Sequence, residues 1–289
     1  MEKHRLNRSL TVTADGEPLS FSGRMRLRGK DDLSLFPALF TLELWNLPEE
    51  LFLRLSRCRE IAVSHGGACL VSGRVWDVYR RGTEEGILTS VSVSIGLDLW
   101  ESVVSLAVPA GTLLSDAVRQ ILAASGTGIP LLTFPEQGDG SARSTDVDLQ
   151  NRNPAKAPPE PLPRRSAVLH RTLSLFGRAS ECIASALSAA SCRAMLTPSG
   201  LMVVPPGGLP DAVNISETDL MDAPAFAGGS LHGSPSLMIL SAAVSGWRPG
   251  QTAEADYKDV HARGIITERS VDADTAAGPW KCEMIVEVT

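Results

Sequence analysis

The sequence predicts a mainly β protein with an α+β insertion, and three patterns carry this prediction. Apolar and polar residues alternate at 40–45 and again at 90–95, a period of two that is typical of strands with one buried face. From Gly111 onward the apolar residues recur at helical spacing instead. The period of two returns at 280–288, where we expect a β-hairpin to close the chain.

These changes of periodicity divide the chain into three expected domains. Residues 1–109 and 206–289 are expected to form β domains, and residues 110–205 are expected to form the insertion between them. A chain of 289 residues is long enough for two or three domains with a substantial core.

Composition and charge narrow the class of protein. The hydrophobic content of 43% and the charged content of 21% are typical of a globular protein. No run of about 18 apolar residues predicts a membrane span, and the residues after Met1–Arg5 do not form the apolar segment of a secretory signal. The net charge of −6 argues against a general nucleic-acid binder, which would be basic.

In the first segment, strands are expected at 70–79 and 88–97, with the polar residues 80–86 as the hairpin loop between them. A short helix is expected between Asn46 and Ser56, because Pro48 and Glu49–Glu50 suit a first helical turn.

Leu51 and Leu55 lie one turn apart on this short helix. We expect the two leucines to cover an open end of the sheet.

Two helices and a hairpin are expected in the insertion. Thr112 is the predicted N-cap of the first helix, which ends at Gly126 and whose buried face is Leu114, Val118, Ile121 and Leu122. The second helix spans about 179–190, with Ile183, Ala186, Leu187 and Ala190 facing inward. A tight hairpin over 193–204, turning at Pro198–Gly200, follows it.

A proline-rich segment at 135–165 separates the two helices. It carries six prolines and few large apolar residues. Two interpretations stay open: a long arm that becomes ordered against a neighbouring subunit, or a flexible surface loop.

The third segment contains a spaced series of turn and strand signals. The series comprises Ser216–Pro224, the apolar stretch Ser236–Val244, Pro249–Gln251, Gly264–Ile266, and Asp272–Thr275 leading into Gly278–Trp280. In the last strand Trp280, Cys282, Met284, Val286 and Val288 share the expected buried face.

This series resembles the C-terminal half of the baseplate hub (late control protein D-like) family of tailed phages. Asp219, Ile266 and Ala273 depart from the family pattern, which has Gly, Tyr and Gly at these positions. The resemblance extends to the first segment through Gly73-Arg74-Val75, and to the helix that follows Gly111-Thr112.

The resemblance implies two tube-type β-barrels in each chain and three chains in a ring with pseudo-sixfold symmetry. Such a homotrimer would be an adaptor that joins a sixfold tail tube protein to a threefold central spike protein. Tape-measure and baseplate wedge proteins would be further partners. The protein would belong to the tail baseplate of a virion, after synthesis in the bacterial cytoplasm.

No catalytic, cofactor-binding or metal-binding residues are expected. The histidines are scattered and form no zinc motif; they are His4, His65, His170, His232 and His261. Asp272 and Asp274 lack the other ligands of a calcium loop and favour an Asx turn. The pairs Gly207–Gly208 and Gly228–Gly229 lack the lysine of a phosphate-binding loop and are expected in ordinary loops.

Two alternatives come from other classes of protein: a tail-associated cell-wall hydrolase and a carbohydrate-binding tail-tip protein. The paired carboxylates Glu49–Glu50 and Glu84–Glu85 are adjacent in sequence and are expected to be solvated, which disfavours a hydrolase. Only 5% of residues are aromatic, which disfavours sugar stacking; the tryptophans, expected mostly within strands or at their ends, are Trp45, Trp76, Trp100, Trp247 and Trp280. The cysteines are odd in number and expected to be free thiols, with Cys182 and Cys282 as small buried apolar residues.

Overall fold

The computed structural model describes residues 8–133, 168–197, 199–227, 236–258 and 260–288. The proline-rich segment 135–165 and both of its interpretations therefore lie outside the described residues. The same holds for His4, His232, Pro198 and the pair Gly228–Gly229.

Among the described residues, one sheet of thirteen strands contains the strands of residues 1–95 and all strands of the third segment. The first segment contributes β1 (Thr11–Ala14), β2 (Glu17–Pro18), β3 (Met25–Asp32), β4 (Ala38–Trp45), β5 (Glu60–His65), β6 (Ala68–Thr83) and β7 (Gly86–Ile95). The third segment contributes β13 (Leu209–Ile215), β14 (Ala225–Ala227), β15 (Leu237–Ala243), β16 (Gln251–Tyr257), β17 (Val260–Asp274) and β18 (Trp280–Val288).

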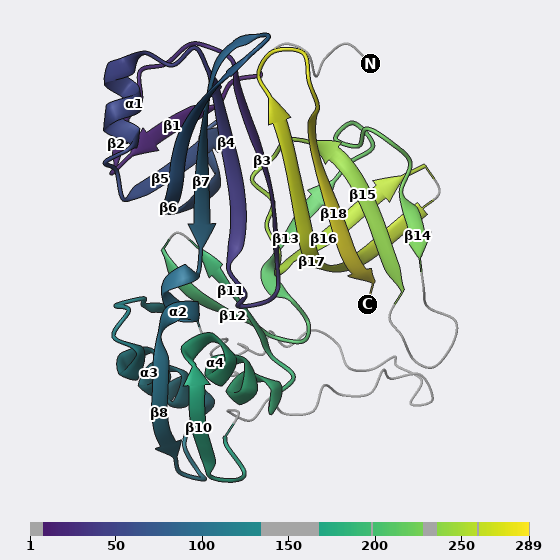
Figure 1. Ribbon diagram of the computed structural model, residues 1–289. Coiled ribbons are helices and arrows are strands. Elements are labelled where there is room, and N and C mark those ends of the chain that lie inside the picture. The colour runs from purple at the N-terminus through teal and green to yellow at the C-terminus, as the bar shows by residue number, and fades with distance from the viewer. Residues whose placement is uncertain (1–7, 134–167, 198, 228–235, 259, 289) are drawn as a thin grey trace, which may run out of the picture.

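The sheet runs in the order β14-β15-β18-β17-β3-β4-β7-β6-β5-β1-β2, with β16 paired to β17 and β13 to β16. Within the described residues the strand pairings do not show the two expected tube-type barrels as closed barrels. The two halves instead form one branched sheet, because β3 of the first segment pairs with β17 of the third, from Glu268–Asp32 to Asp274–Arg26. Figure 1 shows the two halves side by side, joined through these two strands.

The two halves of the sheet repeat one strand pattern. In the first, the long strand β6 pairs with β5 through its first part and with β7 through its second part. In the third segment β17 pairs in the same way with β16 and β18. Each long strand has a register irregularity at the same step, between Val75 and Asp77 and between Ile266 and Glu268.

In each half, a glycine lies where the long strand changes from one partner strand to the other. A Cβ on Gly73 would lie 2.4 Å from the carbonyl oxygen of Ser94, and a Cβ on Gly264 would lie 2.3 Å from that of Glu287. Since real Cβ atoms do not approach this closely, only glycine lets the neighbouring strand pass so near. Gly73 and Gly264 thus occupy equivalent places in β6 and β17.

The described residues of 97–204, called the middle segment from here on, form a separate layered unit below the sheet in Figure 1, so this unit begins before the expected boundary at 110. A two-stranded ribbon pairs β8 (Val103–Val108) with β10 (Leu173–Arg178), and a three-stranded sheet has the order β11-β12-β9. Its other elements are α2 (Leu97–Glu101), α3 (Leu114–Ser125), β9 (Leu131–Thr133), α4 (Ala179–Ser188), β11 (Arg193–Thr197) and β12 (Gly200–Val204). The helices α3 and α4 pack against each other, as their apolar faces predict.

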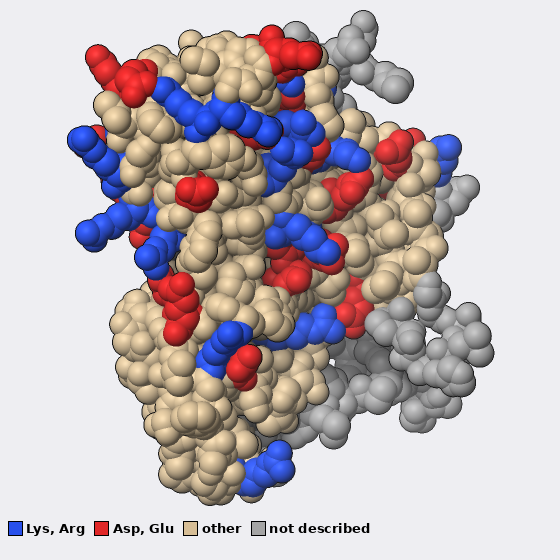
Figure 2. Space-filling model, in the orientation of Figure 1, with Lys and Arg blue, Asp and Glu red and all other residues tan. Residues whose placement is uncertain are grey.

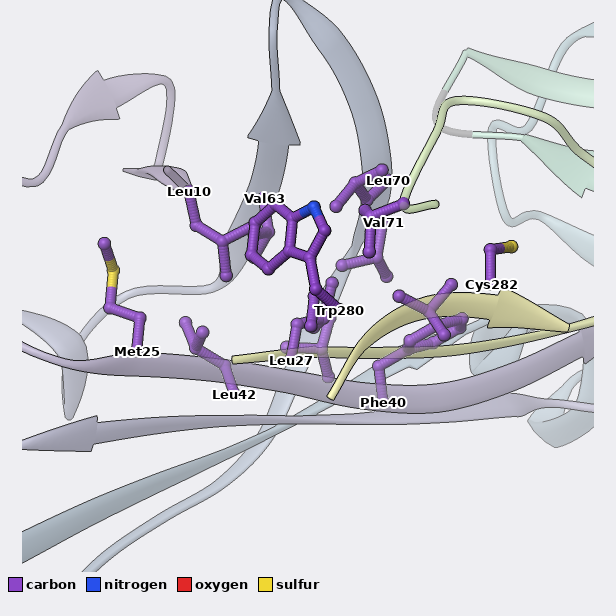
Figure 3. Close-up of a cluster of buried hydrophobic side chains, with 14 of the residues drawn as sticks. Leu10, Met25, Leu27, Phe40, Leu42, Val63, Leu70, Val71, Trp280 and Cys282 are labelled. Carbon is purple, nitrogen blue, oxygen red and sulfur yellow. The ribbon is translucent and has the colours of Figure 1, made fainter. Parts of the chain in front are cut away.

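The described residues form two apolar cores. The first core combines the β halves, so that Trp280 and Cys282 of β18 lie in one cluster with Leu27 of β3 and Val63 of β5 (Figure 3). The second core belongs to the middle segment and includes Val118 and Ile121 of α3 together with Ile183 and Leu187 of α4.

Several local predictions are confirmed. The short helix is α1 (Glu49–Leu55), with Leu55 buried and Leu51 packed against the core. The predicted faces of α3 and α4 are buried, apart from the half-buried Ala190 just beyond α4. The hairpin of β11 and β12 and the closing hairpin of β17 and β18 form as predicted.

Two local predictions are wrong. Residues 80–86 are not a loop, because β6 continues to Thr83 and β7 begins at Gly86, so only Glu84–Glu85 form the turn. Thr112 is not the N-cap of α3, which follows Leu113 and has no side-chain cap hydrogen bond. The helix does end at Gly126, whose φ of 67° suits glycine.

Candidate assembly surfaces

The join between β3 and β17 is held on its inner face by one buried ion pair. Arg269 is 1% exposed and donates from Nε and Nη2 to the two carboxylate oxygens of Asp31, at 2.8 and 2.7 Å. It also donates to the carbonyl oxygens of Leu70 and Trp247, at 2.8 and 3.0 Å. A buried guanidinium requires such partners, since its desolvation would otherwise cost several kcal/mol. This one side chain therefore links β17, β3, β6 and the loop before β16.

The outer face of the same join carries a row of ion pairs between side chains of β3 and β17. Arg26 Nε lies 2.9 Å from Asp272 Oδ1, and Lys30 Nζ lies 2.7 Å from Glu268 Oε2. Figure 2 shows acidic and basic side chains interleaved where β3, β17 and β18 lie in Figure 1. Because the signs alternate, this surface has no single-sign field that would attract a polyanion.

Asp274 ends the join and shapes the turn that follows it. Its side chain accepts hydrogen bonds from the guanidinium of Arg24 and from the N–H of Ala276 at 2.9 Å. Burial alone raises the pKa of this carboxyl, but these hydrogen bonds and the charges of Arg24 and Arg26 hold the pKa below its ordinary value. The predicted Asx turn is confirmed at Asp274, while Asp272 lies within β17 and pairs with Arg26.

The paired carboxylates are not gathered into a reactive site. Glu49 pairs with Arg80, and Glu85 pairs with Arg24 at 2.5 Å. Both glutamates are exposed, as are their neighbours Glu50 and Glu84. General acid–base catalysis needs a carboxyl group held within reach of a bound substrate, and these exposed glutamates line neither a pocket nor a cleft of the described residues.

The described histidines lie apart from one another. His65 stacks edge-on to Trp280, with ring centroids 5.0 Å apart, and His261 Nδ1 lies 2.6 Å from Asp256 Oδ1 on the surface. His170 is exposed in the connection before β10. Within the described ranges, no three histidine, cysteine or acidic side chains are close enough to hold a metal ion. Gly207–Gly208 form a turn before β13.

The described cysteines are free and sheltered. Cys182 and Cys282 are buried, as predicted, and Cys58, Cys69 and Cys192 are partly buried. Burial raises the pKa of the Cys282 thiol to about 12 and that of Cys58 to about 11. Such thiols are poor nucleophiles at neutral pH, because the reactive species is the thiolate.

Two hollows of about 430 and 420 Å³ occur in the described part of the molecule. The first, beside α3, is lined by no acidic residue or histidine. The second lies between the β3–β4 connection and α4, and Glu181 is its only lining carboxylate. Ser180 and Cys192 also line the second hollow, but Ser180 Oγ has no hydrogen-bond partner among the described residues and Cys192 Sγ donates to the carbonyl oxygen of Ala190, so neither is paired with Glu181 as a nucleophile is with its base.

Exposed apolar side chains are the feature that the sequence did not reveal. The most exposed are Phe176, Val103, Phe36, Trp76, Leu39 and Phe226, at 83%, 66%, 63%, 60%, 55% and 54%. The lower part of Figure 2, where β8 and β10 lie, is mostly free of charge. The tryptophans lie mostly within strands or at their ends, as predicted; the exceptions are Trp100 in α2 and Trp247 in the connection before β16. None of the helices in the described ranges has the length and apolar character to cross a membrane.

No protein-family model and no curated protein matches this sequence. Solved structures, in contrast, have a similar fold. A tail protein from Neisseria meningitidis MC58 matches with a TM-score of 0.66 and 10% identity, over 96% of both chains. The 43 kDa tail protein of prophage MuSo2 from Shewanella oneidensis matches with a TM-score of 0.63 and 11% identity, over 96% of this chain and 97% of that one.

A third structure is the E. coli c3393 protein, a component of the type VI secretion system that is similar in structure to the T4 tail proteins gp27 and gp5. It matches with a TM-score of 0.63 and 10% identity, over 96% of this chain and 76% of that one. Together these likenesses show that the chain has the fold of phage tail proteins along nearly its whole length.

Proposed function

We propose that this chain is a structural protein of a phage or phage-like tail, and that its place there is the baseplate hub. The observation that carries the proposal is the fold, which is shared over 96% of this chain with two tail proteins, one of them from a prophage. Such a protein acts by assembly in the virion and has no catalytic role.

The repeated strand pattern supports the adaptor role. Each chain contributes two similar β halves, centred on β6 and β17, so three chains supply six. A homotrimer would thus present a near-sixfold face to a tail tube protein and a threefold face to a central spike protein. Contacts to tape-measure and baseplate wedge proteins belong to the same proposal, as does the division into domains 1–109, 110–205 and 206–289.

The alternatives have less support. A hydrolase needs acidic groups in a shielded pocket, whereas Glu49 and Glu85 are exposed and paired with arginines. A carbohydrate-binding module needs clustered exposed aromatics. Phe36 and Trp100 do lie 5.0 Å apart, but the guanidinium of Arg178 already covers the Trp100 ring at 3.7 Å.

The proposal is tested by light scattering on the full chain, alone and mixed with the tube and spike proteins encoded beside it. We expect a trimer, alone or when the spike is added, and a larger complex with the tube protein. A tube protein from an unrelated particle is the control and should not bind. A chain that stays monomeric in every mixture would refute the hub assignment, and release of fragments from purified cell walls would favour the hydrolase.

A further inference from the structure

One edge of the first half of the sheet is left without a neighbouring strand. Residues 77–83 of β6 pair with β7 on one side, and no described strand lies on their other side. The equivalent residues of β17, 268–274, have neighbours on both sides, namely β18 and β3. An unpaired strand edge presents free N–H and C=O groups that can pair with another chain.

A second edge without a described neighbour lies on β14, the strand at one end of the sheet. β14 pairs with β15 as β3 pairs with β4: Phe226 lies opposite Met238, and Gly29 lies opposite Phe40. Met238 and Phe40 are themselves equivalent. Met238 of β15 lies opposite the buried Val286 of β18, and Phe40 of β4 lies opposite the buried Val93 of β7. β14 therefore occupies the place of β3, but no described strand lies on its outer side.

We infer that β14 of one copy of this chain pairs with the free edge of β6 of the next copy, as β3 pairs with β17 within one chain. In the join between β3 and β17, Gly29 lies opposite Val271. Arg80 takes the place of Val271 in β6, because both lie seven residues after the equivalent glycines Gly73 and Gly264. The equivalent register therefore places Phe226 opposite Arg80. The flanking pairs are then Ala227 with Tyr79, and Ala225 with Arg81. The contact joins two different surfaces, so it is head-to-tail and can close a ring.

The side chains at both edges suit this pairing. Phe226 and Tyr79 are 54% and 44% exposed, a large apolar exposure that a neighbouring strand would remove. The three residues of β14 carry no charge, and two of them are alanines that leave room for a partner. Arg80 already lies over the ring of Phe52 at 4.0 Å, so Phe226 would meet a guanidinium stacked on an aromatic ring.

Cysteine cross-linking of the full chain tests this pairing. The variant Arg81→Cys/Ala225→Cys places two thiols at directly opposed positions, within disulfide reach. Under mild oxidation we expect a ladder of linked chains on a non-reducing gel. The parent chain, with its own cysteines, and the two single variants should give no ladder. The shifted pair Arg81→Cys/Ala227→Cys should link far more slowly, because its Cβ atoms would be roughly 7–8 Å apart.

A second variant tests the role of Phe226 without depending on the disulfide position. In the double-cysteine background, Phe226→Ser should slow the linking about tenfold, since burying a phenylalanine side chain stabilises by more than the 1.4 kcal/mol of a tenfold change. Phe176→Ser, which removes a more exposed phenylalanine far from both edges, should leave the linking rate unchanged.

The number of copies in the ring rests on the proposed function, whereas the strand pairing does not. The outcomes of the cross-linking experiment therefore test the pairing and the trimer separately. A ladder that ends at three chains supports both the pairing and the trimer. A ladder that ends at another number supports the pairing and contradicts the trimer. Absence of linking in Arg81→Cys/Ala225→Cys would overturn the pairing even if light scattering shows a trimer. Linking of either single variant would do the same, because it indicates a two-fold contact.

Discussion

Replacing Asp31 by alanine should leave the guanidinium of Arg269 buried without its counter-charge. The guanidinium is 1% exposed, and two of its four hydrogen bonds go to Asp31. The carbonyl oxygens of Leu70 and Trp247 remain as partners, but they cannot neutralise the charge. Removal of one member of a buried pair typically costs about 3–5 kcal/mol. We expect Asp31→Ala to lower the free energy of unfolding by this amount.

Urea unfolding followed by tryptophan fluorescence measures the loss. Lys30→Ala is the matched control: Lys30 neighbours Asp31 in β3 and pairs with Glu268, but its side chain is 55% exposed. An exposed pair contributes about 0–1 kcal/mol, so the control should unfold almost like the parent. Equal, small losses for both variants would refute the reasoning, because they would mean that Arg269 finds solvent when Asp31 is removed.

Val286 is fully buried in β18, so Val286→Asp should bury an unpaired charge and destabilise the fold by several kcal/mol; an unchanged melting temperature would contradict the core assignment. The pKa of Asp274 is lowered, so its ion pair stabilises the fold above the ordinary carboxyl pKa and is lost as the pH falls through the folded-state pKa. Asp274→Asn should therefore melt below the parent at neutral pH, and the difference should narrow below about pH 4; a constant difference would count against this account. Burial raises the pKa of Cys282 to about 12, so iodoacetamide at neutral pH should label it only after unfolding; mass spectrometry of the native protein that found Cys282 alkylated would be inconsistent with the fold. Gly264→Val should disrupt the contact with the Glu287 backbone and lower the melting temperature strongly, whereas Gly82→Val, where a Cβ meets no atom within 4 Å, should not.

Much of the local structure could be predicted from the sequence because it depends on neighbouring residues. The alternation at 280–288 gave the buried face of β18, and helical spacing gave the buried faces of α3 and α4. Where local signals failed, tertiary contacts were the cause. The charges at Arg80 and Arg81 indicated a loop, but backbone pairing with β7 keeps both residues in a strand, and Arg80 is held by Glu49 and Phe52 of α1.

By itself, the sequence determined which residues face a core and that the chain is mainly β with a helical insertion. The tertiary structure alone decided that β3 pairs with β17, that Arg269 is buried beside Asp31, and that no described strand covers the outer edge of β14 or of residues 77–83 of β6. The physical reason is that side-chain alternation records the environment above and below a strand, whereas its neighbours on either side are joined by backbone hydrogen bonds that are the same for nearly every residue type. A ladder between residues some 240 positions apart therefore leaves no periodic trace in the sequence.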